Sequence, residues 1–358
     1  MNAAKKKRGG CLFPVLFVFL LAVAVLFFGV AYCQNALEPV DPGNKDLITV
    51  EIPKGSTAES IGKLLDDAGV IKSSTVFNYY SRFKKYSSQY IAGFYGFTRG
   101  MSLEEICRII TSGKTNTVSF TIPEGYTEYD IADILAQNGI VDRDKFVYAL
   151  ESHDFTDKFP FLKKAQEGKH RLEGYLFPRT YTIQNGAKPD DIIEAMLARY
   201  DKVYKKRYTD KAGKMGYSEK DIIIIASIVE KEVSTDEERA KVASVIYNRL
   251  NIGMKLQMDA TVNYVLTLLG RERKDDLHNK DTAINSAYNT YKHKGLPPGP
   301  ICCPGEASIK AALSPADTDY LYFVLSDKLD GSMSFSRSSK VFEKNKADYY
   351  KAKKKAGR

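Results

Sequence analysis

The spacing of apolar side chains first marks a long hydrophobic segment near the N-terminus. Residues 11–33 are an almost unbroken apolar run of 23 residues, and no charged side chain lies between Arg8 and Glu38. A run of this length spans a bilayer as one helix. The basic cluster at residues 5–8 precedes it, which places the N-terminus in the cytoplasm. We therefore expect one transmembrane helix, with the rest of the chain outside.

A cleaved signal peptide is the alternative interpretation of this segment. The apolar run is longer than the roughly 7–15 residues that are usual in signal peptides. No clean small-x-small cleavage site precedes the polar turn, which favours the transmembrane interpretation. Residues 34–47 are polar, contain two prolines and are predicted to form a linker.

The next pattern is an internal repeat with an offset of 70 residues. Residues 50–71 and residues 120–141 share an apolar strand-like segment, a Pro-x-Gly turn, a threonine and an amphipathic stretch that stops at glycine. This order predicts a strand, a turn and a threonine-capped helix in each copy. The repeat is either architecture alone or a small carbohydrate-binding module. Five tyrosines in the first copy would then stack on sugar rings or pack within a sheet: Tyr79, Tyr80, Tyr86, Tyr90 and Tyr95.

A continuous apolar stretch at residues 222–229 predicts the helix around which the second half of the chain is organised. Ser218 and Asp221 have the spacing of a capping box, so this helix should begin just before the stretch. Because the stretch is apolar on every side, the helix should lie inside the protein. It is followed by Glu230, and a carboxylate at the end of a buried helix requires a reason.

Helical spacing places Glu230 on one stripe with Ala226 and Ser227, which are both small. An open, apolar space beside the carboxyl would raise its pKa, as a general acid at neutral pH requires. The alternatives are a glutamate that reaches solvent or one that pairs with a basic residue, Lys231 or Arg239. Glu232 lies about 200° from Glu230 around the helix and is expected to face elsewhere and support structure.

Other segments are assigned from their local composition. Residues 171–183 predict a strand or turn that lines a site, with Glu173 as a second acidic candidate, or else a packed strand with a surface glutamate. Residues 295–300, Gly-Leu-Pro-Pro-Gly-Pro, predict a rigid surface turn. Residues 307–313 are expected to be helical and residues 320–325 to be a buried strand. The lysine-rich end is expected to be a solvated helix or tail.

Charge and composition exclude several classes of function. The net charge of +9 falls to −1 once the +4 of residues 5–8 and the +6 of residues 340–358 are set aside, which is not a nucleic-acid-binding surface. The five cysteines and four histidines have no metal-ligand spacing. The sequence contains no phosphate loop, dinucleotide fingerprint or nucleophile elbow. We expect no metal, no cofactor and no nucleic-acid partner.

Seven ordered segments together resemble the YceG-like endolytic murein transglycosylases, the MltG family. They are LEGYLFP (172–178), ASIVEKE (226–232), KVASVIYNRL (241–250), GMKLQMDATVNY (253–264), YNTY (288–291), GLPPGPI (295–301) and SPADTDYLYFV (314–324). The sequence departs from the family's usual pattern at four positions: Arg179, Ala287, Cys303 and Met333.

The resemblance implies an α+β fold with a single N-terminal transmembrane helix, a LysM-like α/β module and a mixed α+β catalytic domain. The implied divisions are a cytoplasmic basic segment (1–10), the transmembrane helix (11–33), a linker (34–47), the LysM-like domain (48–116), the YceG-like catalytic domain (117–345) and a basic tail (346–358). The expected location is the cytoplasmic membrane, with the catalytic domain outside. The expected partners are peptidoglycan strands and the membrane, with cell-wall synthases as candidate protein partners.

The resemblance also implies an activity. The enzyme would be a lytic transglycosylase, a carbon–oxygen lyase that cleaves the MurNAc–GlcNAc β-1,4 bond of nascent glycan strands and leaves 1,6-anhydroMurNAc ends. One carboxyl, assigned to Glu230, would act first as acid and then as base, because the C6 hydroxyl of the substrate is the nucleophile. The residues expected to position the substrate are Glu173, Tyr175, Gln257, Asp259, Thr261, Tyr288, Asn289 and Thr290.

Two other functions remain open at this point. A hydrolase would need a second carboxylate, Glu173 or Asp259, about 5 Å from Glu230 in a retaining enzyme and about 6.5–9.5 Å away in an inverting one. A non-catalytic scaffold of the cell-wall synthesis machinery would hold glycan through the repeat and partner proteins through the membrane helix.

Overall fold

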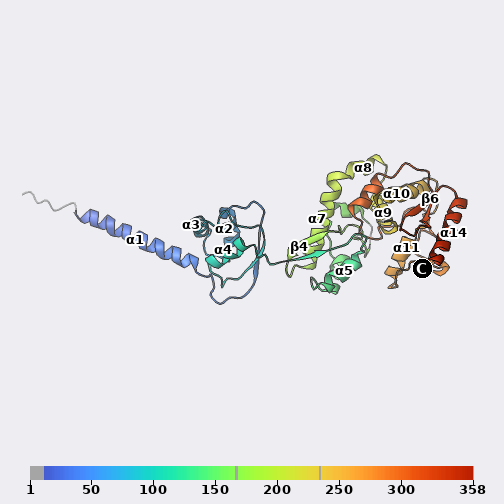
Figure 1. The fold of residues 1–358 in the computed structure, drawn as a ribbon. Coiled ribbons are helices and arrows are strands. Elements are labelled where there is room, and N and C mark those ends of the chain that lie inside the picture. Colours follow the sequence, from blue (N-terminus) through green and yellow to red (C-terminus); the bar gives the residue numbers. More distant parts are fainter. Residues whose placement is uncertain (1–11, 166–167, 234, 358) are drawn as a thin grey trace, which may run out of the picture. The chain divides into compact units, whose positions relative to one another are not determined.

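The computed structural model describes residues 12–165, 168–233 and 235–357, which divide into two compact units. The N-terminal unit runs to Val118 and also includes Ile183–Asn185. The C-terminal unit contains Ser119–Thr182 and the residues from Gly186 onward. Both units combine helices with small two-stranded sheets, so the expected α+β class is confirmed, in a form that is mostly helical (Figure 1).

The N-terminal unit consists of a long helix, α1 (Leu12–Leu37), followed by a small module. The module, residues 38–118, contains β1 (Ile48–Ile52), α2 (Ala58–Asp67), α3 (Ser74–Phe83), β2 (Gly93–Phe97) and α4 (Leu103–Ser112). β1 and β2 pair antiparallel, with Val50 opposite Tyr95. The division from the C-terminal unit falls within the next strand, β3 (Thr117–Thr121).

The sheet and helices of the module enclose one apolar core. Its fully buried side chains include Phe77 from α3 together with Tyr95 and Phe97 from β2. Tyr79 is 68% exposed. The other tyrosines of the group noted in the sequence are buried or partly buried, so ordinary packing accounts for four of the five: Tyr80, Tyr86, Tyr90 and Tyr95.

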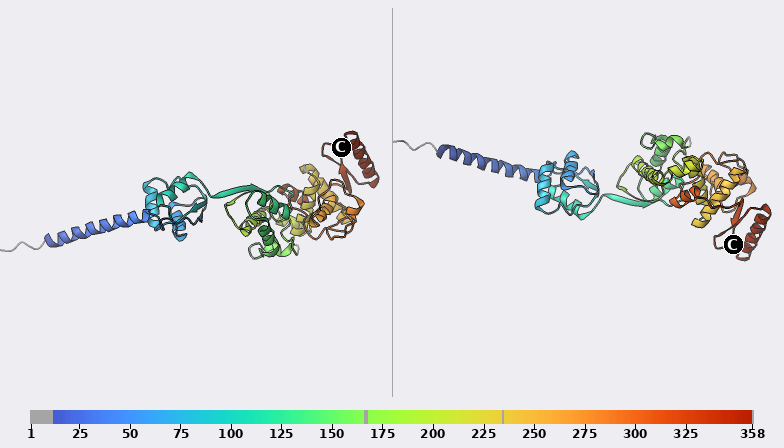
Figure 2. Two further views of the ribbon diagram at one scale, coloured as in Figure 1. Left: turned by 90° about the horizontal axis from the view of Figure 1, so that it is seen from below. Right: turned by 90° about the horizontal axis from the view of Figure 1, so that it is seen from above.

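Helix α1 continues without a break into the module, as both views in Figure 2 show. It ends at Leu37, four residues beyond the predicted end of the transmembrane segment. Ala36 is 3% exposed, Leu37 packs against the module core, and Nζ of Lys72 donates to the carbonyl of Asn35 at 3.0 Å. The start of the expected linker is therefore helix packed on the module. The segment Phe19–Leu37 is long and apolar enough to cross a membrane, a property that a signal sequence shares.

The C-terminal unit is built mainly from helices around α9 (Glu219–Glu232). Its other helices are α5 (Glu128–Gln137), α6 (Arg143–Ser152), α7 (Pro189–Arg207), α8 (Thr209–Lys214), α10 (Asp236–Asn251), α11 (Asp259–Leu268), α12 (Asn279–Thr282), α13 (Glu306–Leu313), α14 (Ser339–Lys355) and a 3-10 helix at Pro160–Lys164. Strand β4 (Thr180–Gln184) pairs with β3, and β5 (Tyr322–Leu325) pairs with β6 (Met333–Ser336).

The central helix forms where the sequence predicts it. Ser218 Oγ accepts the N–H of Asp221 at 3.1 Å, and Asp221 Oδ2 accepts the N–H of Ser218 at 3.0 Å, which completes the capping box. Every residue from Ile222 to Val229 is buried. Because α9 contacts α10, α11 and α13, its C-terminal end is surrounded by the segments that could supply a site.

The internal repeat is confirmed as two strand–turn–helix units. Thr57 caps α2 and Thr127 caps α5, and the glycines that follow these helices, Gly69 and Gly139, have φ of +69° and +66°. The strands have different partners, since β1 pairs with β2 of the module whereas β3 pairs with β4. The same strand–turn–helix unit thus forms in two different sheets.

Two segments differ from their predictions. Pro297, Gly299 and Pro300 are buried, so the turn at residues 295–300 lies mostly inside the C-terminal unit rather than on its surface. Strand β5 is only partly buried along its length. Local composition indicates the backbone shape of both segments but not what packs against them.

Candidate active site

Two carboxylates, Glu230 and Glu232, stand at the C-terminal end of α9 with Lys231 between them. As their spacing predicts, they have different neighbours. Glu230 faces the start of α10 and the loop before α13, whereas Glu232 faces the start of α11. The two carboxylates therefore belong to separate polar clusters.

Glu230 is held by a main-chain hydrogen bond and an ion pair. Its Oε2 accepts the N–H of Gly305 at 2.9 Å, and its Oε1 lies 3.7 Å from Nη2 of Arg239. Arg239 also donates to Asp236 at 2.7 Å. The Glu230 side chain is 7% exposed. The pairing with Arg239, one of the alternatives open from the sequence, joins α9 to α10, and the hydrogen bond from Gly305 joins α9 to the start of α13.

The small residues one turn before Glu230 make room for main chain. The hydroxyl of Ser227 donates to the carbonyl of Ile224 at 2.8 Å and accepts the N–H of Ile301 at 3.0 Å. The thiol of Cys302 contacts the carbonyl of Ser227 at 3.3 Å. Because Ile301 and Cys302 fill the space over Ser227, the expectation of a roomy pocket there is wrong.

Glu124 belongs to the Glu230 cluster and is absent from the candidates predicted from the sequence. Glu124 lies in the Pro-x-Gly turn of the second repeat copy, and the sequence pattern of this turn indicates only a structural role. Burial, and next the Glu230 carboxylate, raise the pKa of Glu124. A side chain at Gly305 would collide with the Glu124 carboxyl, so the turn rests directly on the loop before α13.

Glu232 has the surroundings of a carboxyl that exchanges a proton near neutral pH. It is partly buried, and its Oε1 accepts the N–H of Ala260 at 3.4 Å. Burial, and next the carboxylate of Asp259, raise the pKa of Glu232 to about 7, against the opposing effects of the Ala260 N–H and the Arg249 guanidinium. A carboxyl with this pKa is present in both acid and base forms at neutral pH, which proton transfer in both directions requires.

The carboxylate beside Glu232 is fixed by a tyrosine. Asp259 is exposed in the first turn of α11, and its Oδ1 accepts the hydroxyl of Tyr291. Burial, and next the hydrogen bond to Asp259, raise the pKa of Tyr291. Tyr291 is also absent from the predicted site, although it ends the YNTY segment from which three other candidates come. It keeps the Asp259 carboxylate in place next to Glu232.

Four predicted residues fix the start of α11 and the YNTY segment through hydrogen bonds: Gln257, Thr261, Asn289 and Thr290. The N–H of Gln257 donates to the carbonyl of Thr290 at 3.2 Å, and the N–H of Met258 donates to Thr290 Oγ1 at 3.0 Å. The hydroxyls of Thr261 and Thr290 are 2.9 Å apart. Nδ2 of Asn289 donates to two main-chain carbonyls, at 2.7 and 3.0 Å. Because Thr261, Asn289 and Thr290 are buried, they position Asp259 and Tyr291 rather than face a ligand.

The backbone before α11 is strained at an exposed position. Gln257 has a φ of +48°, in the left-handed region that is unfavourable for residues other than glycine. Arg249 supports the preceding residue, because its guanidinium donates to the carbonyls of Leu256 and Leu321. Burial lowers the pKa of Arg249. The strained backbone lies next to Glu232, a carboxyl whose pKa is shifted. Backbone strain of this kind, maintained by the surrounding contacts, is typical of functional sites.

Two predicted site residues, Glu173 and Tyr175, are buried inside the C-terminal unit, where they contact residues other than Glu230 and Glu232. Glu173 is 1% exposed and accepts the N–H of Glu128 and the hydroxyl of Tyr264, and burial, followed by the charge of Glu128, raises its pKa. The ring of Tyr264 packs on that of Tyr288, with 4.9 Å between centroids. Tyr175 is buried in an aromatic cluster with Phe161 and Tyr200.

Comparison with known proteins shows similarity along most of the chain. Residues 50–348 match the YceG-like family. The chain is 36% identical to the endolytic murein transglycosylase of Bacillus subtilis (strain 168) over 335 residues, which are 90% of each protein. It is 33% identical over 361 residues to the endolytic murein transglycosylase of Streptococcus pneumoniae serotype 2 (strain D39). That match covers 94% of this chain, which spans 65% of the length of the streptococcal relative.

A solved structure supports the same grouping. The crystal structure of a YceG-like protein from Listeria monocytogenes is similar with a TM-score of 0.58 and 35% sequence identity. The similarity covers 84% of this chain and 99% of the Listeria chain. The segments around Glu230, Glu232, Asp259 and Tyr291 all lie within the residues that match the family. The chain belongs to the YceG-like family.

Proposed function

We propose that this protein is an endolytic lytic transglycosylase of peptidoglycan. It cleaves the β-1,4 bond between MurNAc and GlcNAc in nascent glycan strands and leaves 1,6-anhydroMurNAc ends. Relatives at 33% and 36% identity carry the name endolytic murein transglycosylase. Within the site, the observation that carries the proposal is Glu232, a partly buried carboxyl with a pKa of about 7 beside a second carboxylate.

The surroundings favour Glu232 over Glu230 as the residue that transfers the proton. Helical spacing and family resemblance predict Glu230, and this remains a prediction without a direct test. Glu230 is nevertheless held by Arg239 and the Gly305 N–H, contacts that stabilise the fold. Glu232 faces an exposed carboxylate, Asp259, at a strained part of the backbone. We therefore assign proton transfer to Glu232 and a structural role to Glu230.

The proposed reaction needs one proton carrier. Protonated Glu232 donates to the glycosidic oxygen, the bond between that oxygen and C1 of MurNAc breaks, and positive charge develops at C1. The C6 hydroxyl of the same MurNAc attacks C1 and closes the anhydro ring, while its proton passes to the Glu232 carboxylate. Atoms balance without water, and the enzyme returns to its starting state. Asp259, held by Tyr291, stabilises the developing positive charge.

The proposal also places the protein in the cytoplasmic membrane. Helix α1 is the single membrane span, the basic N-terminal segment lies in the cytoplasm, and the C-terminal unit lies outside. Within the module, residues 48–116 are a LysM-like domain that holds glycan. Peptidoglycan strands are the substrate, and cell-wall synthases are the candidate protein partners.

Product analysis tests the proposed reaction. We expect the full-length protein to convert nascent glycan strands into fragments that end in 1,6-anhydroMurNAc, which mass spectrometry recognises as a loss of one water. Glu232→Gln serves as the matched inactive control. Fragments with reducing ends only would show a hydrolase, and unchanged strands would support the non-catalytic scaffold.

The rate of cleavage should fall as the pH rises through about 7. The protonated form of Glu232 is the proton donor, and its pKa of about 7 means that this form is lost over the range around neutral pH. Asp259→Asn removes the neighbouring negative charge that helps to raise this pKa, so its alkaline limb should move to lower pH. The measurement is kcat/KM for strand cleavage across the neutral range. A profile that stays flat on the alkaline side would exclude Glu232 as the acid.

A further inference from the structure

We propose that the C-terminal end of α3 is a second membrane contact, at which Phe83 and its basic neighbours rest on the anionic headgroup surface of a phospholipid bilayer. The basic neighbours are Arg82, Lys84 and Lys85. This inference rests on the proposed membrane-spanning role of α1. It concerns the module rather than the cleavage site.

The composition of this helix end fits a membrane surface. Phe83 is 82% exposed, more than any other large apolar side chain whose exposure the structure describes. A single exposed ring needs no explanation by itself. The side chains of Arg82, Lys84 and Lys85 are also exposed, however, so an apolar ring stands within a group of three positive charges. Aromatic rings among basic side chains are typical of segments that lie at the headgroup boundary.

The charge of the surrounding segment has one sign. Residues 68–103 contain five basic side chains and no aspartate or glutamate: Lys72, Arg82, Lys84, Lys85 and Arg99. Of the flanking acids, Asp66 accepts the N–H of Ser74 at 2.9 Å and Glu104 pairs with Arg108 at 2.6 Å within the module, whereas Asp67 is exposed. An anionic surface is complementary to this segment, and a neutral one is not.

The connection to α1 keeps the module close to the bilayer. The apolar run ends at Cys33, and Asn35 already contacts Lys72 of the module. The headgroup layer adds roughly 5–8 Å beyond the hydrocarbon on each side. Asn35 follows the end of the apolar run by two residues, or about 3 Å of helix, and therefore lies within this layer. Because α1 is unbroken and Ala36 is buried, the module has no slack with which to move away from the surface.

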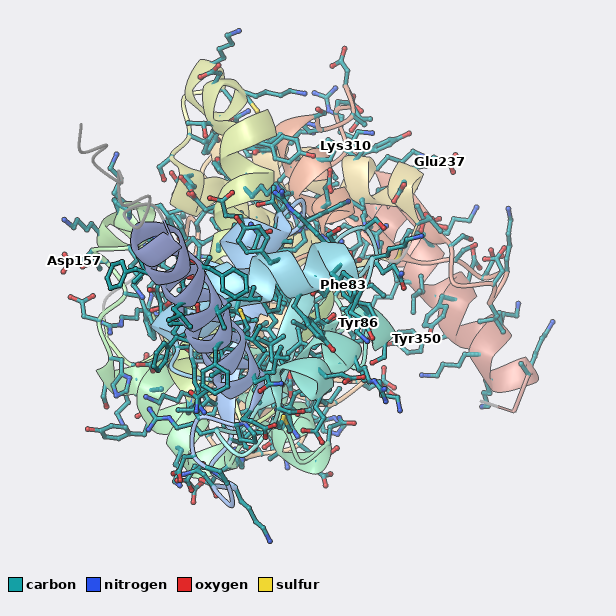
Figure 3. All side chains as sticks on the ribbon, turned by 90° about the vertical axis from the view of Figure 1, so that its left-hand side faces the viewer. Phe83, Tyr86, Asp157, Glu237, Lys310 and Tyr350 are labelled. Atoms are coloured by element: carbon teal, nitrogen blue, oxygen red, sulfur yellow. The ribbon has the colours of Figure 1, made fainter. Side chains whose placement is uncertain are left out.

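Helix α3 lies on the side of the module from which α1 leaves. α1 contacts α3 and α4, and Lys72, which contacts Asn35, comes two residues before the start of α3. Figure 1 shows α3 at the side of the module that α1 enters, and Figure 3 labels Phe83 and Tyr86 in the view from that side. The basic end of α3 therefore belongs to the face that an inserted α1 presents to the lipid headgroups.

A tryptophan introduced at residue 83 can test this contact by its fluorescence, because the chain contains no other tryptophan. Full-length Phe83→Trp protein is placed in nanodiscs of phosphatidylcholine, with or without phosphatidylglycerol, and its fluorescence is quenched with brominated phospholipid. We expect a blue-shifted emission and strong quenching in the anionic discs, and several-fold weaker quenching in the neutral ones. The matched control replaces Arg82, Lys84 and Lys85 by glutamine in the same protein, which should reduce quenching in anionic discs to the neutral level.

The outcomes separate this contact from the proposals on which it rests. Solvent-exposed, unquenched emission from protein that co-elutes with anionic discs would overturn it, and so would equal quenching with and without the three charges. Protein that fails to enter any disc would overturn the membrane-spanning role of α1, and this inference with it. Strand cleavage is measured separately, so a loss of quenching with normal anhydro products refers to the α3 contact alone.

Discussion

Replacing Glu232 by glutamine is expected to lower the rate of glycan cleavage by about 10²–10⁴-fold, the usual cost of removing a general acid–base catalyst. Glutamine keeps the size of the side chain and its carbonyl can still accept the N–H of Ala260, but it cannot donate the proton. The loss should be large because both halves of the reaction use the same group. Release of 1,6-anhydro fragments by purified full-length protein is the measurement.

The same substitution has a distinct effect on stability, which serves as a folding control. The folded-state pKa of Glu232 lies above its ordinary value of 4.5, so the folded protein binds this proton more tightly than the unfolded chain does. Wild-type stability therefore falls as the pH rises from about 4.5 through about 7. Glu232→Gln removes this pH-dependent loss of stability, because glutamine does not ionise. The variant should unfold at a higher temperature than the wild type above pH 7, and the difference should shrink in acid.

Glu230→Gln is the matched variant on the same helix. It weakens the ion pair with Arg239 and should destabilise the C-terminal unit by about 1–3 kcal/mol, while most cleavage activity remains under conditions in which the protein is folded. An inactive Glu230→Gln protein with an active Glu232→Gln protein would reverse our assignment and restore the one predicted from the sequence. Activity in both would remove the end of α9 from the reaction.

Gly174→Ala is expected to destabilise the C-terminal unit by about 2–5 kcal/mol. Gly174 has a φ of +87°, which costs other residues about 1–2 kcal/mol. An added Cβ would lie 2.6 Å from the ring of Pro300 and 2.9 Å from Cγ2 of Ile223. Both neighbours are buried, Ile223 within α9, so neither can move freely and overpacking adds about 1–3 kcal/mol. Denaturant unfolding followed by circular dichroism gives the difference.

Gly186→Ala separates the two contributions. Gly186 has a φ of +77°, similar to that of Gly174, but an added Cβ would meet no atom within 4 Å. The loss of stability in Gly186→Ala should therefore be limited to the backbone cost of about 1–2 kcal/mol. Equal losses in the two variants would mean that the contact between Gly174 and Pro300 does not constrain the fold.

The parts of this fold that depend on neighbouring residues in the chain could be predicted from the sequence. The capping box at Ser218, the buried run of α9 and the two threonine-capped repeat copies all form as expected, because their hydrogen bonds join residues a few positions apart. The α+β class followed from the same patterns. The resemblance to the YceG-like family rested on segments that the family match includes.

The surroundings of the two glutamates of α9 could not be predicted in the same way. Helical spacing separates Glu230 from Glu232 and leaves Arg239 as one possible partner of Glu230, but it does not show what Glu232 faces, because its neighbours come from α11. Arg239 reaches Glu230 from α10, and Asp259 reaches Glu232 from α11. The segment that fills the space over Ser227 comes from about 75 residues further along, so no local pattern indicated it. Pro300 is buried for the same reason, because the residues next to it, such as Gly174, lie far from it in the chain.

The two adjacent cysteines of the segment over Ser227 determine how the chain would respond to oxidation in its proposed location outside the cytoplasm. Cys302 and Cys303 are both fully buried, and burial raises the pKa of each thiol well above its ordinary value. The thiolate is the form that attacks disulfides and alkylating reagents, and oxidants reach a buried sulfur poorly. Both sulfurs therefore remain as protonated packing atoms. A chain folded in this way tolerates unpaired thiols in an oxidising compartment and needs no disulfide to protect them.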